Sequence, residues 1–165
     1  MNDDYIEYMI KRNNTIGGLA ARIGSVLLVI VCVMLYPVLN FIAFGISVLA
    51  AYLVRYTFQT TNVEYEYIYF AGECQIDKIM AKRKRKRCSV IELEKVEIIA
   101  PADSNQLKSY ENKDCITKKY VSGTQEGKQY IAFQRKDSEL IKIVFEPNEA
   151  ILKAMQTNSP RKVII

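Results

Sequence analysis

The sequence predicts an α+β protein: a pair of membrane-spanning helices followed by a domain of antiparallel strands that ends in one helix. Three observations support this class. The stretch from Ile23 to Val54 carries no charged residue and lies between Arg22 and Arg55. From residue 62 onward the apolar residues alternate at period two, which is typical of strands. Near the C-terminus, Pro147 opens a short segment with helical periodicity.

The apolar stretch is too long for one straight membrane span. As a single helix it would measure about 48 Å, against a hydrocarbon core of about 30 Å. Tyr36-Pro37 and Asn40 are its least helix-friendly and most polar part, so we expect the chain to turn there. The sequence therefore predicts a transmembrane helical hairpin over residues 16–57, with spans at about 16–35 and 37–56.

Residues 1–15 are predicted to form a separate N-terminal amphipathic segment. The apolar residues Tyr5, Ile6, Met9 and Ile10 recur at helical spacing and alternate with charged residues. This pattern predicts a short helix that lies at the membrane interface, with a frayed terminus as the alternative.

Small residues recur at every fourth position in both predicted spans. The two sets are Gly17, Ala21 and Ser25 in the first span, and Ala43, Ser47 and Ala51 in the second. A turn near Tyr36-Pro37 would place Ser25 near Ser47 and Ala21 near Ala51, which would let the helices approach closely in lipid. The alternative is that small residues are simply common in membrane helices.

The flanking charges predict the orientation of the hairpin. Lys11, Arg12 and Arg22 precede or begin the first span, and Arg55 and a basic run follow the second, whereas the turn carries no charge. The positive-inside rule then places both termini in the cytoplasm. An odd set of three cysteines outside the apolar stretch suits a reducing compartment.

A domain over residues 62–160 follows the hairpin, with seven predicted strands and one helix. The strands are expected at 63–70, 74–80, 87–93, 96–100, 115–121, 129–134 and 140–145. The helix is expected from Pro147 to about Gln156, where Asn158-Ser159-Pro160 ends it.

This order of elements resembles the pleckstrin-homology-like (PH-like) fold. The resemblance is carried by residues 79–99, in which a basic segment is followed by two strands, and by the ending at 143–149. Two spans followed by such a domain are similar to a family of small bacterial membrane proteins with PH-like domains. The resemblance implies a seven-stranded antiparallel barrel or sandwich capped by the final helix. It also implies a binding or scaffolding module in the bacterial inner membrane, and it names no ligand.

A run of six basic residues is the sharpest local feature of the domain: Lys82, Arg83, Lys84, Arg85, Lys86 and Arg87. It is predicted to occupy a strand–turn–strand connection. Next to a membrane, such a run is well placed to attract anionic lipid headgroups. The alternatives are a solvated edge that guards a strand against aggregation, or contact with nucleic acid or another partner. PH domains that bind phosphoinositides typically use the connection between the first two strands, whereas this run follows the second. General attraction to the lipid surface is therefore favoured over specific headgroup binding.

No pattern in the sequence indicates catalysis. The chain has no histidine, its cysteines are widely spaced, and acidic pairs such as Glu64/Glu66 are interpreted as solvated strand faces. We therefore expect an integral membrane protein that is not an enzyme and uses no metal or cofactor. Its domain would bind a partner protein, a second copy of the chain or the anionic lipid surface. The alternatives are a membrane-tethered nucleic-acid-binding module and a structural subunit of a membrane complex.

Overall fold

The computed structural model describes residues 5–13, 16–110, 113–124 and 128–165, and it leaves the side chains of residues 36, 38–41, 43 and 60 undescribed. The chain divides into two compact units. The helical unit consists of Asn13–Val63 together with Met80–Lys84. The β unit consists of the chain up to Arg12 together with Glu64–Ile79 and Arg85–Ile165. The helical segment is therefore inserted into the sequence of the β unit. The sequence had predicted that the helices precede the domain, and that prediction was wrong.

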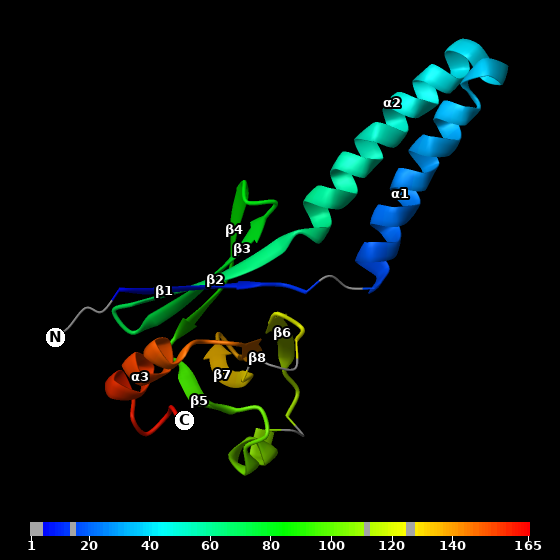
Figure 1. The fold of residues 1–165 in the computed structure, drawn as a ribbon. Helices are drawn as coiled ribbons and strands as arrows, with labels where there is room; N and C mark the ends of the chain where they lie inside the picture. Colours follow the sequence, from blue (N-terminus) through cyan, green and yellow to red (C-terminus); the bar gives the residue numbers. More distant parts are fainter. Residues whose placement is uncertain (1–4, 14–15, 111–112, 125–127) are drawn as a thin grey trace. The chain divides into compact units, whose positions relative to one another are not determined.

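The helical unit contains two antiparallel helices, α1 (Ile16–Met34) and α2 (Tyr36–Thr61), which pack against each other (Figure 1). Leu35 alone separates them. The predicted turn at Tyr36-Pro37 and Asn40 was wrong by a few residues, because these residues begin α2. Pro37 is in the first turn of α2, where a residue without an N–H group breaks no helical hydrogen bond.

The contact between the helices follows a spacing of alternately three and four residues. The less exposed positions of the two helices are Gly18, Arg22, Ser25, Val29 and Cys32 in α1, and Ser47, Ala50, Val54, Thr57 and Thr61 in α2. This spacing is that of helices packed at a shallow crossing angle, and it is offset from the predicted four-residue stripes.

The predicted stripes are correct at Ser25 and Ser47 and wrong at three other positions. Gly17, Ala21 and Ala51 are exposed, and Gly18 is the glycine that faces α2. The predicted register was also wrong, since Ser25 lies 3.3 Å from Thr57 through their hydroxyl oxygens and not beside Ser47. A four-residue repeat drifts around a helix with 3.6 residues per turn, so it cannot stay on one contact face. The side chain of Ala43 lies outside the described residues.

Most of the apolar surface of the helical unit is exposed. In α1, only 6% of the residues in the most apolar stretch of 18 are buried, and the exposed side chains include Ile23, Leu27 and Val31. Among the described residues, α1 is the one helix that is long and apolar enough to cross a membrane by length and composition. The prediction of two transmembrane spans is thus supported for the first span alone.

The N-terminal segment is a strand, so the predicted amphipathic helix was wrong. β1 (Ile6–Lys11) pairs in antiparallel fashion with β2 (Val63–Phe70), with Tyr8 opposite Tyr67 and Lys11 opposite Glu64. Ile6, Tyr8 and Ile10 are more buried than their neighbours, which is the period of two that a strand requires. In so short a segment the apolar residues fit the period of a helix as well as that of a strand. The hydrogen bonds to β2 favour the strand.

The first sheet has the strand order β1-β2-β3-β4, with β3 at Glu73–Met80 and β4 at Lys84–Glu92. Along β2, the buried side chains of Tyr65, Tyr67 and Tyr69 alternate with those of the opposite face, so these tyrosines belong to the core.

The second sheet has the strand order β5-β7-β8-β6. Its strands are β5 (Val96–Pro101), β6 (Ile116–Tyr120), β7 (Tyr130–Lys136) and β8 (Glu139–Phe145), and a 3-10 helix, η1, spans Asn105–Tyr110. β6 runs parallel to β8, contrary to the purely antiparallel arrangement that was predicted. In the described part of the chain the strands form two four-stranded sheets and not a closed barrel, so the barrel form of the prediction was wrong.

The final helix, α3, spans Glu149–Asn158. Its N-cap is Asn148, whose side-chain oxygen accepts a hydrogen bond from the Ile151 amide, so the helix begins two residues later than the sequence predicted. The domain also extends past residue 160, because the Ile164 amide donates to the Ile99 carbonyl at 2.9 Å and adds the C-terminal tail to β5.

Tyr67 connects the two sheets of the β unit. Its hydroxyl donates to the Tyr120 carbonyl at 2.5 Å and accepts from the Glu146 amide at 3.2 Å, and both partners belong to the second-sheet side of the core. Its ring meets that of Phe145 edge to face and stacks on that of Tyr8. The side chain is fully buried, and burial raises the pKa of its hydroxyl well above the ordinary value.

Candidate functional site

The first two residues of the basic run, Lys82 and Arg83, lie in a tight turn within the helical unit. The Arg83 amide donates to the Met80 carbonyl at 3.1 Å, and Ala81 and Lys82 between them have φ values of 49° and 56°. Two successive positive φ values are the signature of a type I′ turn, the common connection of a β-hairpin. This turn joins β3 to β4 and projects the Lys82 and Arg83 side chains into solvent.

The basic turn is attached to the end of α2. The Ala81 amide donates to the carbonyl of Asn62, the residue that caps α2, at 2.9 Å. Lys82, Arg83 and Lys84 therefore lie at the end of the helical unit where the chain leaves α2, and all three are exposed. We call these three residues, the two in the turn and the first of the following strand, the basic turn.

The last four residues of the basic run lie in a strand. β4 begins at Lys84, so Lys84, Arg85, Lys86 and Arg87 are strand residues and not part of the predicted connection. β4 is the last strand of its sheet, and an edge strand tolerates charged side chains because one of its edges faces solvent. The solvated-edge interpretation therefore fits Lys86 and Arg87, which are exposed.

Arg85 is occupied within the β unit. Its guanidinium forms an ion pair with the carboxylate of Glu66, and its Nε lies 3.7 Å from a carboxylate oxygen of Asp77. Both acidic side chains are buried, at 1% and 3% exposure, so the interpretation of Glu66 as a solvated residue was wrong. An arginine that neutralises two buried carboxylates contributes to the fold and adds little to a lipid-binding surface.

Glu66 is also paired with Glu7 of β1. Burial and the hydrogen bond to Glu7 raise the pKa of Glu66, whereas the same hydrogen bond lowers the pKa of Glu7. The hydrogen bond therefore favours the protonated form of Glu66 and the ionised form of Glu7, whereas the charge of Arg85 lowers the pKa of both. Sequence reasoning missed this pair because the two residues are close only when β1 lies beside β2.

A polar cluster connects α1 and α2 near the basic turn. Arg22 donates from Nε to Thr61 Oγ1 at 2.7 Å, and its guanidinium carbon lies 5.1 Å from the centroid of the Phe58 ring. Thr61 Oγ1 donates in turn to the Thr57 carbonyl at 2.6 Å. The Arg22 Nη2 atom is buried and has no hydrogen-bond partner among the described residues.

Gly18 allows the close approach that this cluster requires. A Cβ atom at Gly18 would lie 3.1 Å from Thr61 Cγ2, whereas one at Gly17 would meet nothing within 4 Å. Glycine at position 18 therefore brings the backbone of α1 close to α2 at the level of Thr61.

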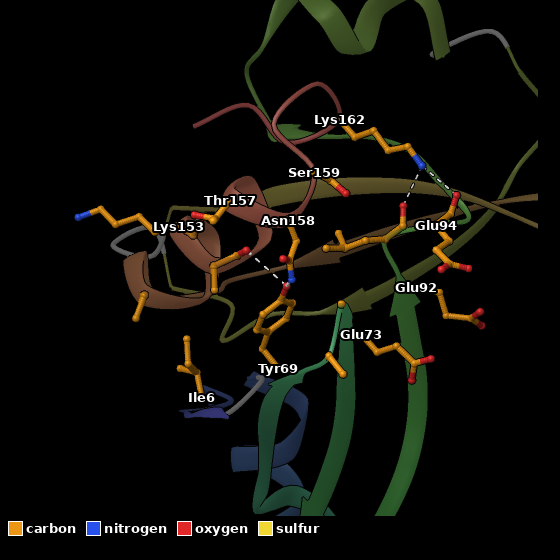
Figure 2. Close-up of a pocket in the computed structure, with 15 residues that line it drawn as sticks. Ile6, Tyr69, Glu73, Glu92, Glu94, Lys153, Thr157, Asn158, Ser159 and Lys162 are labelled. Atoms are coloured by element: carbon orange, nitrogen blue, oxygen red, sulfur yellow. Dashed lines mark hydrogen bonds between the residues drawn. The ribbon is translucent and has the colours of Figure 1, made fainter. Parts of the chain in front are cut away.

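A cavity of about 930 Å³ lies within the β unit, between the C-terminal half of α3 and the β2–β3 and β4–β5 turns (Figure 2). Much of its polar lining holds α3 and the tail to the sheets. Lys162 Nζ donates to the Leu93 and Glu94 carbonyls at 2.8 Å each, and Asn158 donates to the Tyr69 hydroxyl at 2.5 Å. Its polar groups are thus largely engaged within the chain, and we do not assign it a ligand.

The cysteines show no metal-binding arrangement in the part of the chain that the structure describes, where no three His, Cys, Asp or Glu side chains are placed to hold an ion. Burial raises the pKa of the Cys74 thiol to about 12, whereas Cys88 and Cys115 are partly exposed. Cys74 is therefore a buried apolar side chain.

The comparison with protein families supports the fold described above. The model of the family "Bacterial PH-like domain (DUF6106)" matches residues 2–165, which include β1 and both helices. A comparison with the curated proteins found no match. Because the family model covers nearly the whole chain, the protein belongs to the bacterial PH-like domain family.

Proposed function

We propose that this protein is an integral protein of the bacterial inner membrane whose helical pair crosses the bilayer twice, and whose basic turn binds the anionic surface of the cytoplasmic leaflet. In this proposal the PH-like domain is a binding module for the lipid surface and for partner proteins, and it performs no chemical reaction. The observation that carries the proposal is the attachment of the basic turn to the end of α2.

The pairing of β1 with β2 supports two crossings. Lys11 and Glu64 are opposite each other in one sheet, so both must lie on the same side of a membrane. The segment between them can then cross the bilayer only an even number of times. Since α1 is apolar, exposed and long enough to cross, an even number of crossings supports α2 as the segment that returns the chain to the side from which α1 started.

The charges of the helical unit support the orientation. The unit has no acidic residue, and three of its basic residues form the basic turn at the end of α2. Basic residues near the ends of spans favour the cytoplasmic side, which supports a cytoplasmic position for both termini. Each basic residue near an anionic surface contributes about 1 kcal/mol of attraction, so the basic turn supplies up to about 3 kcal/mol.

Reporters of sidedness attached to each terminus of the full chain test the double crossing. We expect both reporters to give a cytoplasmic signal. Opposite signals at the two termini would refute the proposal, because they require a single crossing that also separates β1 from β2.

The composition of the lipid that copurifies with the full-length protein in polymer-bounded discs tests the role of the basic turn. The triple variant K82Q/R83Q/K84Q should lose most of the enrichment in anionic lipid. The matched control K108Q/K119Q/K128Q removes the same charge from exposed positions of the β unit and should retain that enrichment. Equal loss in the two variants would show that only net charge matters, and retention in both would remove the lipid role.

A further inference from the structure

We propose that Arg22 is the anchoring residue of a binding site for the phosphate group of an anionic phospholipid, at the end of the helical pair where the basic turn lies. This inference rests on the proposed membrane insertion and adds to it a specific ligand-binding residue. It departs from the general surface attraction considered above because it assigns a defined hydrogen-bond donor.

The first argument is the unmet hydrogen-bonding capacity of Arg22. Its Nε is fixed by Thr61 Oγ1, and one guanidinium face lies over the Phe58 ring, so the orientation of the group is set by two contacts. The Nη2 atom is nevertheless buried without a partner in the described part of the chain. A guanidinium donor within an apolar span is costly unless something pairs with it.

The second argument is the absence of a counter-charge in the sequence of the helical unit. Neither residues 13–63 nor residues 80–84 contain an aspartate or glutamate, so the unit cannot neutralise Arg22 with a carboxylate of its own. An anion must come from outside the unit. In a membrane the abundant anions at the depth of a helix end are lipid phosphates, which an arginine binds with charge-assisted hydrogen bonds.

The third argument is the position of the basic turn. Thr61, which orients Arg22, is followed by Asn62, and the Asn62 carbonyl accepts the hydrogen bond from Ala81. Lys82 and Arg83 directly follow Ala81 in the chain, and Ala81 is hydrogen-bonded at the end of α2 that contains Thr61. A phosphate held by Arg22 would lie in a region that carries several positive charges and no negative charge of the same unit.

The test measures phosphatidylglycerol and phosphatidylcholine binding to the full-length protein in detergent by native mass spectrometry. We expect wild type to bind the first phosphatidylglycerol more tightly than phosphatidylcholine. Arg22→Gln should lower that first binding constant about tenfold, the size expected for one charge-assisted hydrogen bond. The matched control Arg55→Gln removes the same charge from an exposed position of α2 and should lower it less than about twofold.

Equal effects of the two arginine variants would overturn the inference, and so would a lack of preference of wild type for phosphatidylglycerol. Displacement of the lipid by inorganic phosphate would also overturn it, because it would assign the site to a soluble anion. If Arg22→Gln fails to fold, Thr61→Val provides a second route, since it keeps the charge and removes the oxygen that orients the guanidinium. It should still weaken the first binding step, and unchanged binding would overturn the inference. Resistance of wild type to carbonate extraction is measured separately, so a failure of membrane insertion is distinguishable from a failure of the lipid site.

Discussion

Replacing Tyr67 by phenylalanine removes a single buried oxygen, and the loss is expected to fall on the connection between the two sheets. The hydroxyl donates to the Tyr120 carbonyl and accepts from the Glu146 amide, so its removal leaves two groups of the second-sheet side without their partner. A buried polar group left unpaired costs about 1–3 kcal/mol, so we expect a loss of about 2–4 kcal/mol in the free energy of unfolding. For a chain of this size, that loss corresponds to a fall in Tm of about 4–16 °C.

The assay is thermal unfolding of the full chain in one detergent, followed by the near-ultraviolet signal of the tyrosines. Tyr65→Phe is the matched control, because Tyr65 is a buried tyrosine of the same strand whose hydroxyl makes no hydrogen bond within the described residues. It should change the free energy of unfolding by less than about 0.5 kcal/mol. Since burial raises the pKa of Tyr67, its hydroxyl remains protonated and the difference should not vary between neutral and mildly alkaline pH. Equal Tm values for the two variants would refute the role assigned to Tyr67.

Three further outcomes follow from the described contacts. Alkylation of the native protein at mildly alkaline pH should label Cys88 and leave Cys74 unmodified, because the buried Cys74 thiol has a pKa of about 12. Mass spectrometry of the labelled peptides measures the modification of each cysteine. Rapid labelling of Cys74 would contradict its burial. Because the pKa of Glu66 is raised in the folded state, its contribution to stability is present below the ordinary value of 4.5 and is lost as the pH rises through the folded-state pKa. Denaturant midpoints measured across pH should therefore fall less steeply for Glu66→Gln than for wild type, and parallel profiles would contradict the raised pKa of Glu66. Gly18→Val should disrupt helix pairing and lower the yield of folded protein, whereas Gly17→Val should leave it unchanged; similar yields would show that Gly18 does not face α2.

The sequence predicted those parts of the fold in which local pattern and tertiary environment agree. β2 was predicted with its observed bounds, because its three tyrosines alternate with residues of the opposite face over the whole strand. α3 was found within two residues from its proline and its helical periodicity. In both cases the residues that form the element also determine what it buries.

Elements that depend on distant partners were predicted poorly. β1 fits a helix as well as a strand until β2 lies beside it, and its partner is separated from it by both helices. Four residues of the basic run lie in β4 although lysine and arginine have low strand propensity, since an edge position and the pairing of Arg85 with Glu66 outweigh that preference. The parallel pairing of β6 with β8 leaves no mark in the local pattern of either strand.

Part of the candidate site could be predicted from the sequence. A run of six basic residues identifies a cationic surface, but it does not distinguish Arg85, which neutralises buried carboxylates, from Lys82, which is exposed in a turn. The role of Arg22 was not visible at all, because it depends on the register between α1 and α2. That register is set by Gly18 and the threonines of α2, and not by the small-residue stripes that dominate the sequence.

The insertion of the helices between β1 and β2 also has a consequence for the order in which the protein folds. During synthesis β1 is made first, yet its neighbour in the sheet is made only after α1 and α2 are complete. Closing a free loop of about 50 residues would carry a considerable entropy cost. Once α1 and α2 have paired, the free segments that remain between β1 and β2 are only a few residues long, and the sheet can form at little cost. Substitutions that loosen the helix pair should therefore slow the assembly of the first sheet, although they lie outside the β unit.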